Sequence, residues 1–96
     1  MKSTKLVCHK IEPGKYRHFY PNEVCVKMCG NGDIKKVTVT EDANGNYWAW
    51  WDNERQSFLL VYSSKLLVDI CFPGGVDMAE KLGKGHLLQV SVTEDE

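Results

Sequence analysis

The sequence predicts a small α+β domain with a mostly antiparallel, twisted sheet of about five or six strands and one or two short helices. Three observations predict this class: two Asn-Gly pairs between apolar segments, a continuous apolar run at 58–62, and strict alternation at 88–93. Asn-Gly favours hairpin turns because a type I′ turn needs positive φ at both central residues. A chain of 96 residues fits one domain, 1–96, with a core of about 5–93.

The two Asn-Gly pairs, Asn31-Gly32 and Asn44-Gly45, predict a three-stranded meander. If each pair forms a two-residue turn, the strands run roughly over 23–29, 34–42 and 46–52. Directly opposed residues of antiparallel strands point to the same face of the sheet. Both turns then place the same apolar residues on one face, which we expect to be the core face: Val24, Val26, Val37, Val39, Trp48 and Trp50.

The segment 58–62 is apolar at every position, which is typical of a strand that is covered on both sides. One alternate set of its side chains must therefore point away from the predicted core face. The sets are Phe58, Leu60 and Tyr62, or Leu59 and Val61.

The segment 65–72 fits two structures. Its apolar residues form one helical stripe, and Ser63 or Ser64 can cap the helix. Its β-branched residues also fit a strand, which would make the fold a small β-barrel. We favour the helix. The stripe consists of Leu66, Leu67, Ile70 and Cys71.

The remaining elements are shorter or simpler. A first strand is expected at 5–11, and a short helix at 76–82 has Asp77 in its first turn and ends at Gly83. In the last strand, 86–93, apolar Leu88, Val90 and Val92 alternate with polar residues, so one face is expected to be wet.

Composition narrows the function classes. The 12 basic and 13 acidic residues give a net charge of −1, which argues against nucleic-acid binding. Several lysines in the first 36 residues leave an oligonucleotide-binding sheet as a third reading. No apolar run is long enough for a signal peptide or a membrane span. We therefore expect no membrane association, a cytoplasmic location and reduced cysteines.

The sequence predicts no catalytic residues, no metal site and no cofactor. Cys25 and Cys29 form the tightest Cys pair, but on a strand they lie about 13 Å apart, too far to share a metal ion. The cysteines are therefore expected to be buried thiols. No nucleophile elbow or phosphate-binding loop is present, and Pro73-Gly74-Gly75 fits an ordinary turn. An enzyme is disfavoured.

Aromatic residues are the remaining candidates for a site. Tyr47 and Trp51 fall on the second sheet face, where they either lie beneath 65–72 or form an interface or ligand pocket. The sequence favours a small cytosolic binding or regulatory protein that contacts an unknown protein partner and self-associates as a homodimer. The alternative is a small-molecule-binding protein or enzyme with an aromatic pocket. The candidate binding residues are Tyr47, Trp51, Tyr16, Phe19 and Tyr20.

Overall fold

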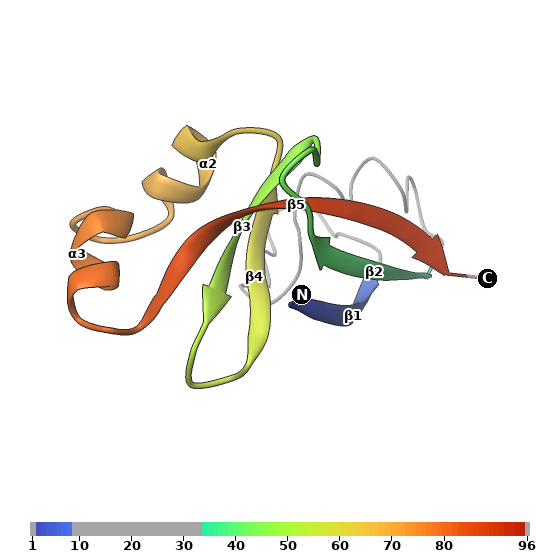
Figure 1. Ribbon diagram of the computed structural model, residues 1–96, viewed down its shortest axis with the longest axis horizontal. Coiled ribbons are helices and arrows are strands. Elements are labelled where there is room, and N and C mark those ends of the chain that lie inside the picture. The colour runs from blue at the N-terminus through green and yellow to red at the C-terminus, as the bar shows by residue number, and fades with distance from the viewer. Residues whose placement is uncertain (1, 9–33, 96) are drawn as a thin grey trace.

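The computed structural model describes residues 2–8 and 34–95. Within these residues the chain forms five strands and two helices, arranged as a curled antiparallel sheet with the helices at one end (Figure 1). The predicted α+β class is confirmed. The elements are β1 (Ser3–Cys8), β2 (Lys35–Glu41), β3 (Tyr47–Asp52), β4 (Ser57–Tyr62), α2 (Lys65–Ile70), α3 (Val76–Lys81) and β5 (Gly85–Asp95).

β5 is the central strand of the sheet, whose order is β1-β2-β5-β3-β4. Its first half pairs with β3 and its second half with β2, so that Val90 opposes both Tyr47 and Glu41. In Figure 1 this long, curved strand runs from α3 across both halves of the sheet. The two edge strands, β1 and β4, also contact each other. The sheet therefore curls into a half-barrel.

The predicted pairing of the strands at 34–42 and 46–52 is wrong, because β5 lies between them. Asn44 and Gly45 are not the centre of a two-residue hairpin. Instead, the Gly45 amide donates to the Asp42 carbonyl (3.0 Å) and the Asn44 amide to the Asp42 carboxylate (2.9 Å). Gly45 has no positive φ; a Cβ there would lie 2.0 Å from the Val90 carbonyl oxygen. Glycine is needed for this close approach to β5, not for turn geometry.

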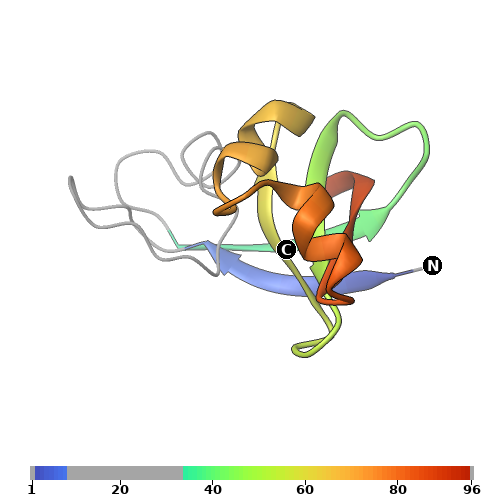
Figure 2. The same cartoon turned by 90° about the vertical axis from the view of Figure 1, so that its left-hand side faces the viewer.

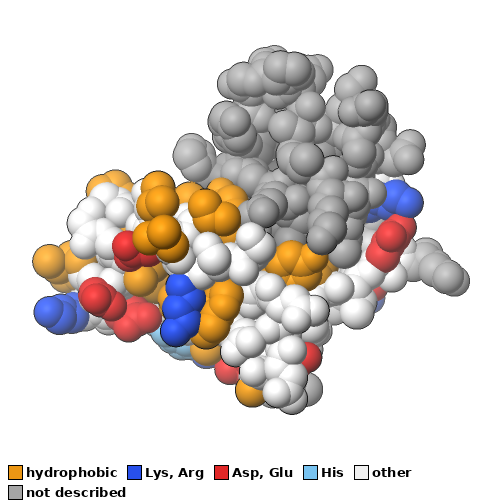
Figure 3. Space-filling view, turned by 90° about the horizontal axis from the view of Figure 1, so that it is seen from above, with side chains coloured by type: hydrophobic (Ala, Val, Ile, Leu, Met, Phe, Trp, Pro, Cys, Tyr) orange, Lys and Arg blue, Asp and Glu red, His pale blue; other side chains and the backbone are white. Residues whose placement is uncertain are grey.

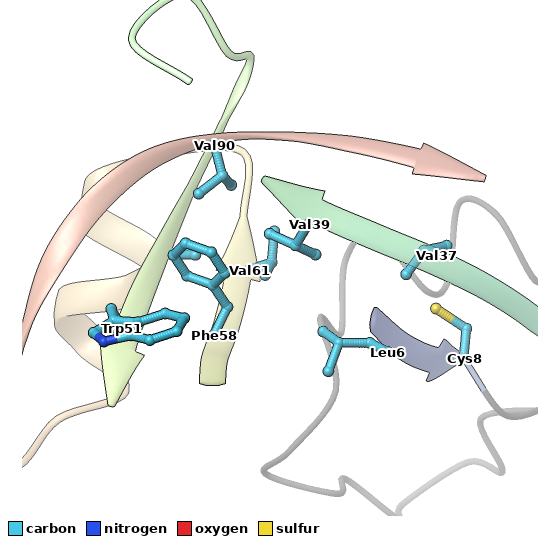
Figure 4. Packing of buried hydrophobic residues seen from close by; sticks show 9 residues of the cluster. Leu6, Cys8, Val37, Val39, Trp51, Phe58, Val61 and Val90 are labelled. Carbon is cyan, nitrogen blue, oxygen red and sulfur yellow. The ribbon is translucent and has the colours of Figure 1, made fainter. Parts of the chain in front are cut away.

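The concave face of the sheet holds the first hydrophobic core. Its side chains come from all five strands and converge inside the half-barrel (Figure 4). The Trp51 ring packs edge-on against Phe58, with ring centroids 4.9 Å apart. The buried residues of this concave core are Leu6, Cys8, Val37, Val39, Ala49, Trp51, Phe58, Val61 and Val90.

The helices cover the other face of the sheet over β3 and β4. Viewed from that end, α2 and α3 lie in front of the strands (Figure 2). Trp50 is 1% exposed there, and its ring centroid lies 4.7 Å from that of Phe72. The buried residues of this helix-covered core are Trp50, Leu60, Val68, Val76 and Ala79.

The predicted core face is therefore wrong for the tryptophans. Val37 and Val39 lie in the concave core, whereas Trp48 and Trp50 face the helices. The error follows from the predicted pairing, because inserting β5 changes which residues of β2 and β3 share a face. Val24 and Val26, with the Asn31-Gly32 hairpin and the 23–29 strand, lie outside the described residues.

A β-bulge in β4 divides its apolar residues in a way that neither alternate set predicted. The register between β3 and β4 shifts between Trp48 and Trp50, and Leu60 has a φ of 58°. Such a φ is unusual for a bulky residue, and the bulge reverses the alternation of the strand. Consequently Phe58 and Val61 enter the concave core, whereas Leu59, Leu60 and Tyr62 face the helices.

Several local predictions are confirmed. Residues 65–70 are helical, so the strand that the barrel alternative required there is absent. The helix at 76–81 carries Asp77 in its first turn, and Gly83 follows it with a φ of 72°. In β5, Leu88, Val90 and Val92 alternate as expected and pack in the concave core.

Each of the two described cysteines departs from one part of the prediction of reduced, buried thiols. Cys8 is buried as expected but disulfide-bonded, whereas Cys71 is a free thiol as expected but exposed. The prediction is therefore wrong for the oxidation state of Cys8 and for the burial of Cys71. Over the ranges 2–8 and 34–95, no helix is long and apolar enough to cross a bilayer.

Candidate functional site

The first helix of the candidate site, α2, begins where the sequence predicts a cap. The Ser64 side chain accepts a hydrogen bond from the Leu67 amide (3.4 Å), which satisfies one of the free donors at the helix start. Val68 is the residue of α2 that is fully buried, and it packs toward the sheet. Lys65 lies with its Nζ 4.4 Å from the centroid of the Trp48 ring. These contacts fix which side of the helix faces the sheet.

The second helix, α3, is attached to α2 by one side chain. Its N-cap residue is Gly75, which has no side chain, and Asp69 of α2 supplies the missing acceptor to the Val76 amide (2.8 Å). A Cβ on Gly75 would lie 3.1 Å from the same carboxylate oxygen. The negative charge at the helix N-terminus is also favourable. Asp69 therefore holds the two helices in a fixed relation.

The C-terminus of α3 ends in a Schellman motif. The Lys84 amide donates to the Ala79 carbonyl (3.1 Å), and the Gly83 amide donates to the Glu80 carbonyl (3.0 Å). The Glu80 carboxylate also accepts from the Leu87 amide of β5 (3.3 Å). The helix pair is therefore tied to the sheet at both of its ends.

The outward side of this helix pair is apolar. Leu66 and Ile70 of α2 are 66% and 68% exposed, and they lie one turn apart on the same side of the helix. Figure 3 shows hydrophobic side chains gathered over the end of the molecule that carries α2 and α3. We call this the outer apolar surface; its residues are Leu66, Leu67, Ile70, Met78 and Leu82.

The structure places two of the predicted binding residues, Tyr47 and Trp51, away from the outer apolar surface. Trp51 is only 6% exposed and belongs to the concave core, on the sheet face opposite the helices. Tyr47 is half-buried and packs against the same core. Neither residue lies beneath 65–72 or on the outer apolar surface. Tyr16, Phe19 and Tyr20 lie outside the described residues.

The aromatic pocket predicted with the 16–20 segment stays a prediction, because that segment lies outside the described residues. A hollow of about 600 Å³ lies at β1, β2 and the end of β5. Neither Tyr47 nor Trp51 lines it. Charged groups predominate in its lining: Lys5, Leu6, Val7, Lys36, Glu94 and Asp95.

The outer apolar surface was missed because its signal was read only as evidence for a helix. The stripe formed by Leu66, Leu67, Ile70 and Cys71 has helical spacing, but spacing does not say which side faces the sheet. Val68, outside the stripe, is the buried residue. Apolar residues on both sides of so short a helix could have indicated the surface, because only one side of the helix can face the sheet.

Within the two described ranges, no group of three or more His, Cys, Asp or Glu side chains is placed to hold a metal ion. Comparisons with family models, with curated proteins and with solved structures found no match to this chain. The candidate site is therefore assigned from its geometry alone.

Proposed function

We propose that this protein is a protein-binding module that acts through its outer apolar surface and self-associates as a homodimer. The observation that carries the proposal is the outward direction of the α2 stripe: Leu66 and Ile70 are exposed while Val68 between them is buried. Apolar surface gathered in one place costs free energy in water, and such patches mark interaction sites.

A protein partner fits this surface better than a small ligand. Leu66, Ile70 and Met78 project from the outside of two helices, not into a concave pocket, and the exposed fraction of each exceeds one half. Small-molecule sites are concave and bury most of their ligand, whereas protein interfaces have an apolar centre and a polar rim.

A second copy of this chain is the occupant that the charges favour. The polar side chains next to the outer apolar surface carry both signs, and all of them are exposed. In a dimer with twofold symmetry the same patch faces itself, so mixed charges can pair across the axis. A rim of one sign would repel its copy. The charged rim residues are Lys65, Asp77, Glu80, Lys81 and Lys84.

The experiment is sedimentation equilibrium of the purified protein over a range of concentrations, with native mass spectrometry as a second measurement. We expect a dimer whose dissociation constant rises about tenfold or more in Ile70→Glu, because a buried, unpaired charge is costly at an interface centre. Circular dichroism of the variant should match the wild type, since Ile70 is 68% exposed in the monomer.

Ile34→Glu is the matched control. Ile34 is 66% exposed, close to Ile70 in exposure and chemistry, but it precedes β2 at the other end of the sheet. We expect this variant to dimerise like the wild type. A protein that is monomeric at every concentration, or equal weakening by both variants, would contradict self-association through the outer apolar surface.

The cytoplasmic location expected from the sequence stays a prediction, which cell fractionation tests. Disulfides are rare in cytosolic proteins, so the disulfide at Cys8 argues for an oxidising compartment. Alkylation of thiols before lysis, without reductant, would label Cys71 and Cys8 alike in a reducing compartment and only Cys71 of the two in an oxidising one.

A further inference from the structure

The two helices that carry the outer apolar surface are not anchored equally. In α2, Val68 is completely buried against the sheet, and the Ser64 side chain caps the helix start. In α3, the buried residues are Val76 and Ala79, each 7% exposed, and alanine is the smaller of the two side chains. A helix of six residues is not stable alone in water. The order of α3 therefore depends on a small number of contacts with the rest of the chain.

Glycines with a positive φ stand on both sides of α3. Gly74 and Gly75 precede the helix with φ values of 83° and 86°, and Gly83 follows it with a φ of 72°. Glycine adopts this conformation without a steric penalty and also reaches the other regions of φ and ψ easily. In Figure 1, α3 lies at one end of the molecule between the two connecting segments. Both segments can change direction without strain, which is what a hinge requires.

Two carboxylates hold α3 between these glycines. The Asp69 carboxylate of α2 accepts from the Val76 amide (2.8 Å), in place of the side-chain cap that Gly75 cannot provide. The Glu80 carboxylate accepts from the Leu87 amide of β5 over a longer distance, 3.3 Å, in an exposed position. Neither bond belongs to the ladders of the sheet. Both bonds can therefore break while the strands stay paired.

The core beneath α3 is separate from the concave core. Val76 and Ala79 pack in the helix-covered core with Trp50, which is 1% exposed. The concave core lies on the opposite face of the sheet, and none of its residues comes from α3. Opening of α3 would expose apolar surface around Trp50, so the open form has the higher free energy. It would leave the packing of the concave core unchanged.

We propose that α3 opens as a unit in the monomer while the sheet stays folded, and that a second copy of the chain closes it. The closing step rests on the proposed self-association. Met78 and Leu82 of α3 form the outer apolar surface together with Leu66 and Ile70 of α2. A second copy that contacts both helices gains its full contact area only when α3 is closed. Dimerisation therefore favours the closed form by mass action.

Hydrogen exchange, measured by NMR below the dimer dissociation constant, tests whether α3 opens separately from the sheet. Val39→Ala destabilises the concave core and should speed the exchange of the β3 amides about tenfold or more. The α3 reporters should keep their wild-type rates, because the closed and open forms both retain the folded sheet. Equal acceleration of the two sets of amides would overturn the separate opening. The reporters are the hydrogen-bonded amides of Val76, Leu82 and Lys84.

Two changes at Asp69 test what holds the helix closed. Asp69→Ala removes the acceptor of the Val76 amide and should speed the exchange of the α3 reporters about tenfold, the size expected for one hydrogen bond to a charged group. Asp69→Asn keeps an oxygen acceptor and is the matched control, with rates within about threefold of the wild type. Unchanged rates in Asp69→Ala, or equal acceleration in both variants, would overturn the role of this carboxylate.

Closure by the second copy is tested with the same reporters at higher protein concentration. At about ten times the dimer dissociation constant, they should exchange about tenfold more slowly than in the monomer. Ile70→Glu, which weakens the dimer, should slow them about twofold or less at the same concentration. If sedimentation shows a dimer and the reporters do not slow, closure is wrong. A monomer at every concentration would overturn the proposed function and the closure, whereas Val39→Ala still decides the opening of α3.

Discussion

The two sheet faces bury comparable aromatic residues but leave different surfaces to the solvent. On the concave face the sheet covers itself by curling, and Trp51, at 6% exposure, packs against Phe58. On the other face two short helices cover Trp50, which is 1% exposed. The helices carry further apolar side chains on their outer side. Among the described residues the concave face is filled by side chains of the sheet itself, whereas the covering helices present a new surface of their own.

The largest effect should come from removing the tryptophan on either face. We expect Trp50→Ala and Trp51→Ala each to lower the free energy of unfolding by about 3–5 kcal/mol, because each leaves a large cavity in a buried core. Urea denaturation followed by circular dichroism gives both values. If Trp51→Ala were nearly neutral for stability while altering association, the concave core would be an interface instead, and the comparison of the two faces would fail.

The inner and outer sides of α2 provide a smaller and sharper test. Val68→Ala should cost about 1–3 kcal/mol of unfolding free energy, because Val68 is fully buried against the sheet. Leu66→Ala should change it by less than about 0.5 kcal/mol, because Leu66 is 66% exposed and alanine is a good helix former. Both are measured on the monomer, at concentrations below the dimer dissociation constant. The reverse order would mean that the stripe of α2 faces the sheet.

The smallest effect concerns the start of the same helix. Ser64→Ala removes the side-chain acceptor of the Leu67 amide and should cost about 0.5–1 kcal/mol. Ser64→Asp keeps an acceptor at this position and should retain the wild-type stability. Comparing the thermal unfolding of the two variants shows whether stability depends on the side-chain acceptor or on any change at position 64. Equal losses would show that the serine does not cap α2.

Most strands and helices of this fold could be predicted from the sequence, but which strands lie next to each other could not. Alternation identified the last strand because it is a local property, and the strands at 34–42 and 46–52 followed from the Asn-Gly pairs beside them. Which strands pair is a long-range property, and the Asn44-Gly45 pair predicted a hairpin that the structure replaces with β5. Glycine is required at position 45 for a different reason, its close approach to the Val90 backbone. The local sequence pattern gives no sign of that contact. The bulge at Leu60 is likewise invisible in a run of apolar residues.

The candidate site shows the same limit. The sequence predicted a cap at Ser63 or Ser64 and the helical stripe, both of which involve residues within one or two turns. The side of α2 that faces the sheet depends on Trp50, Phe72 and Val76, whose positions follow from the whole fold. The side-chain contact between Lys2 and His86 likewise joins residues 84 positions apart, and no spacing rule connects them.

The central place of β5 has a consequence for how the chain acquires its structure. β2 and β3 precede β5 in the sequence, and both pair with it rather than with each other. During synthesis from the N-terminus these two strands are made before their shared neighbour exists. We expect the early chain to sample the hairpin around Asn44-Gly45, which is local and fast to form. That hairpin must open before β5 can enter, so the last strand of the sheet should set the rate of folding.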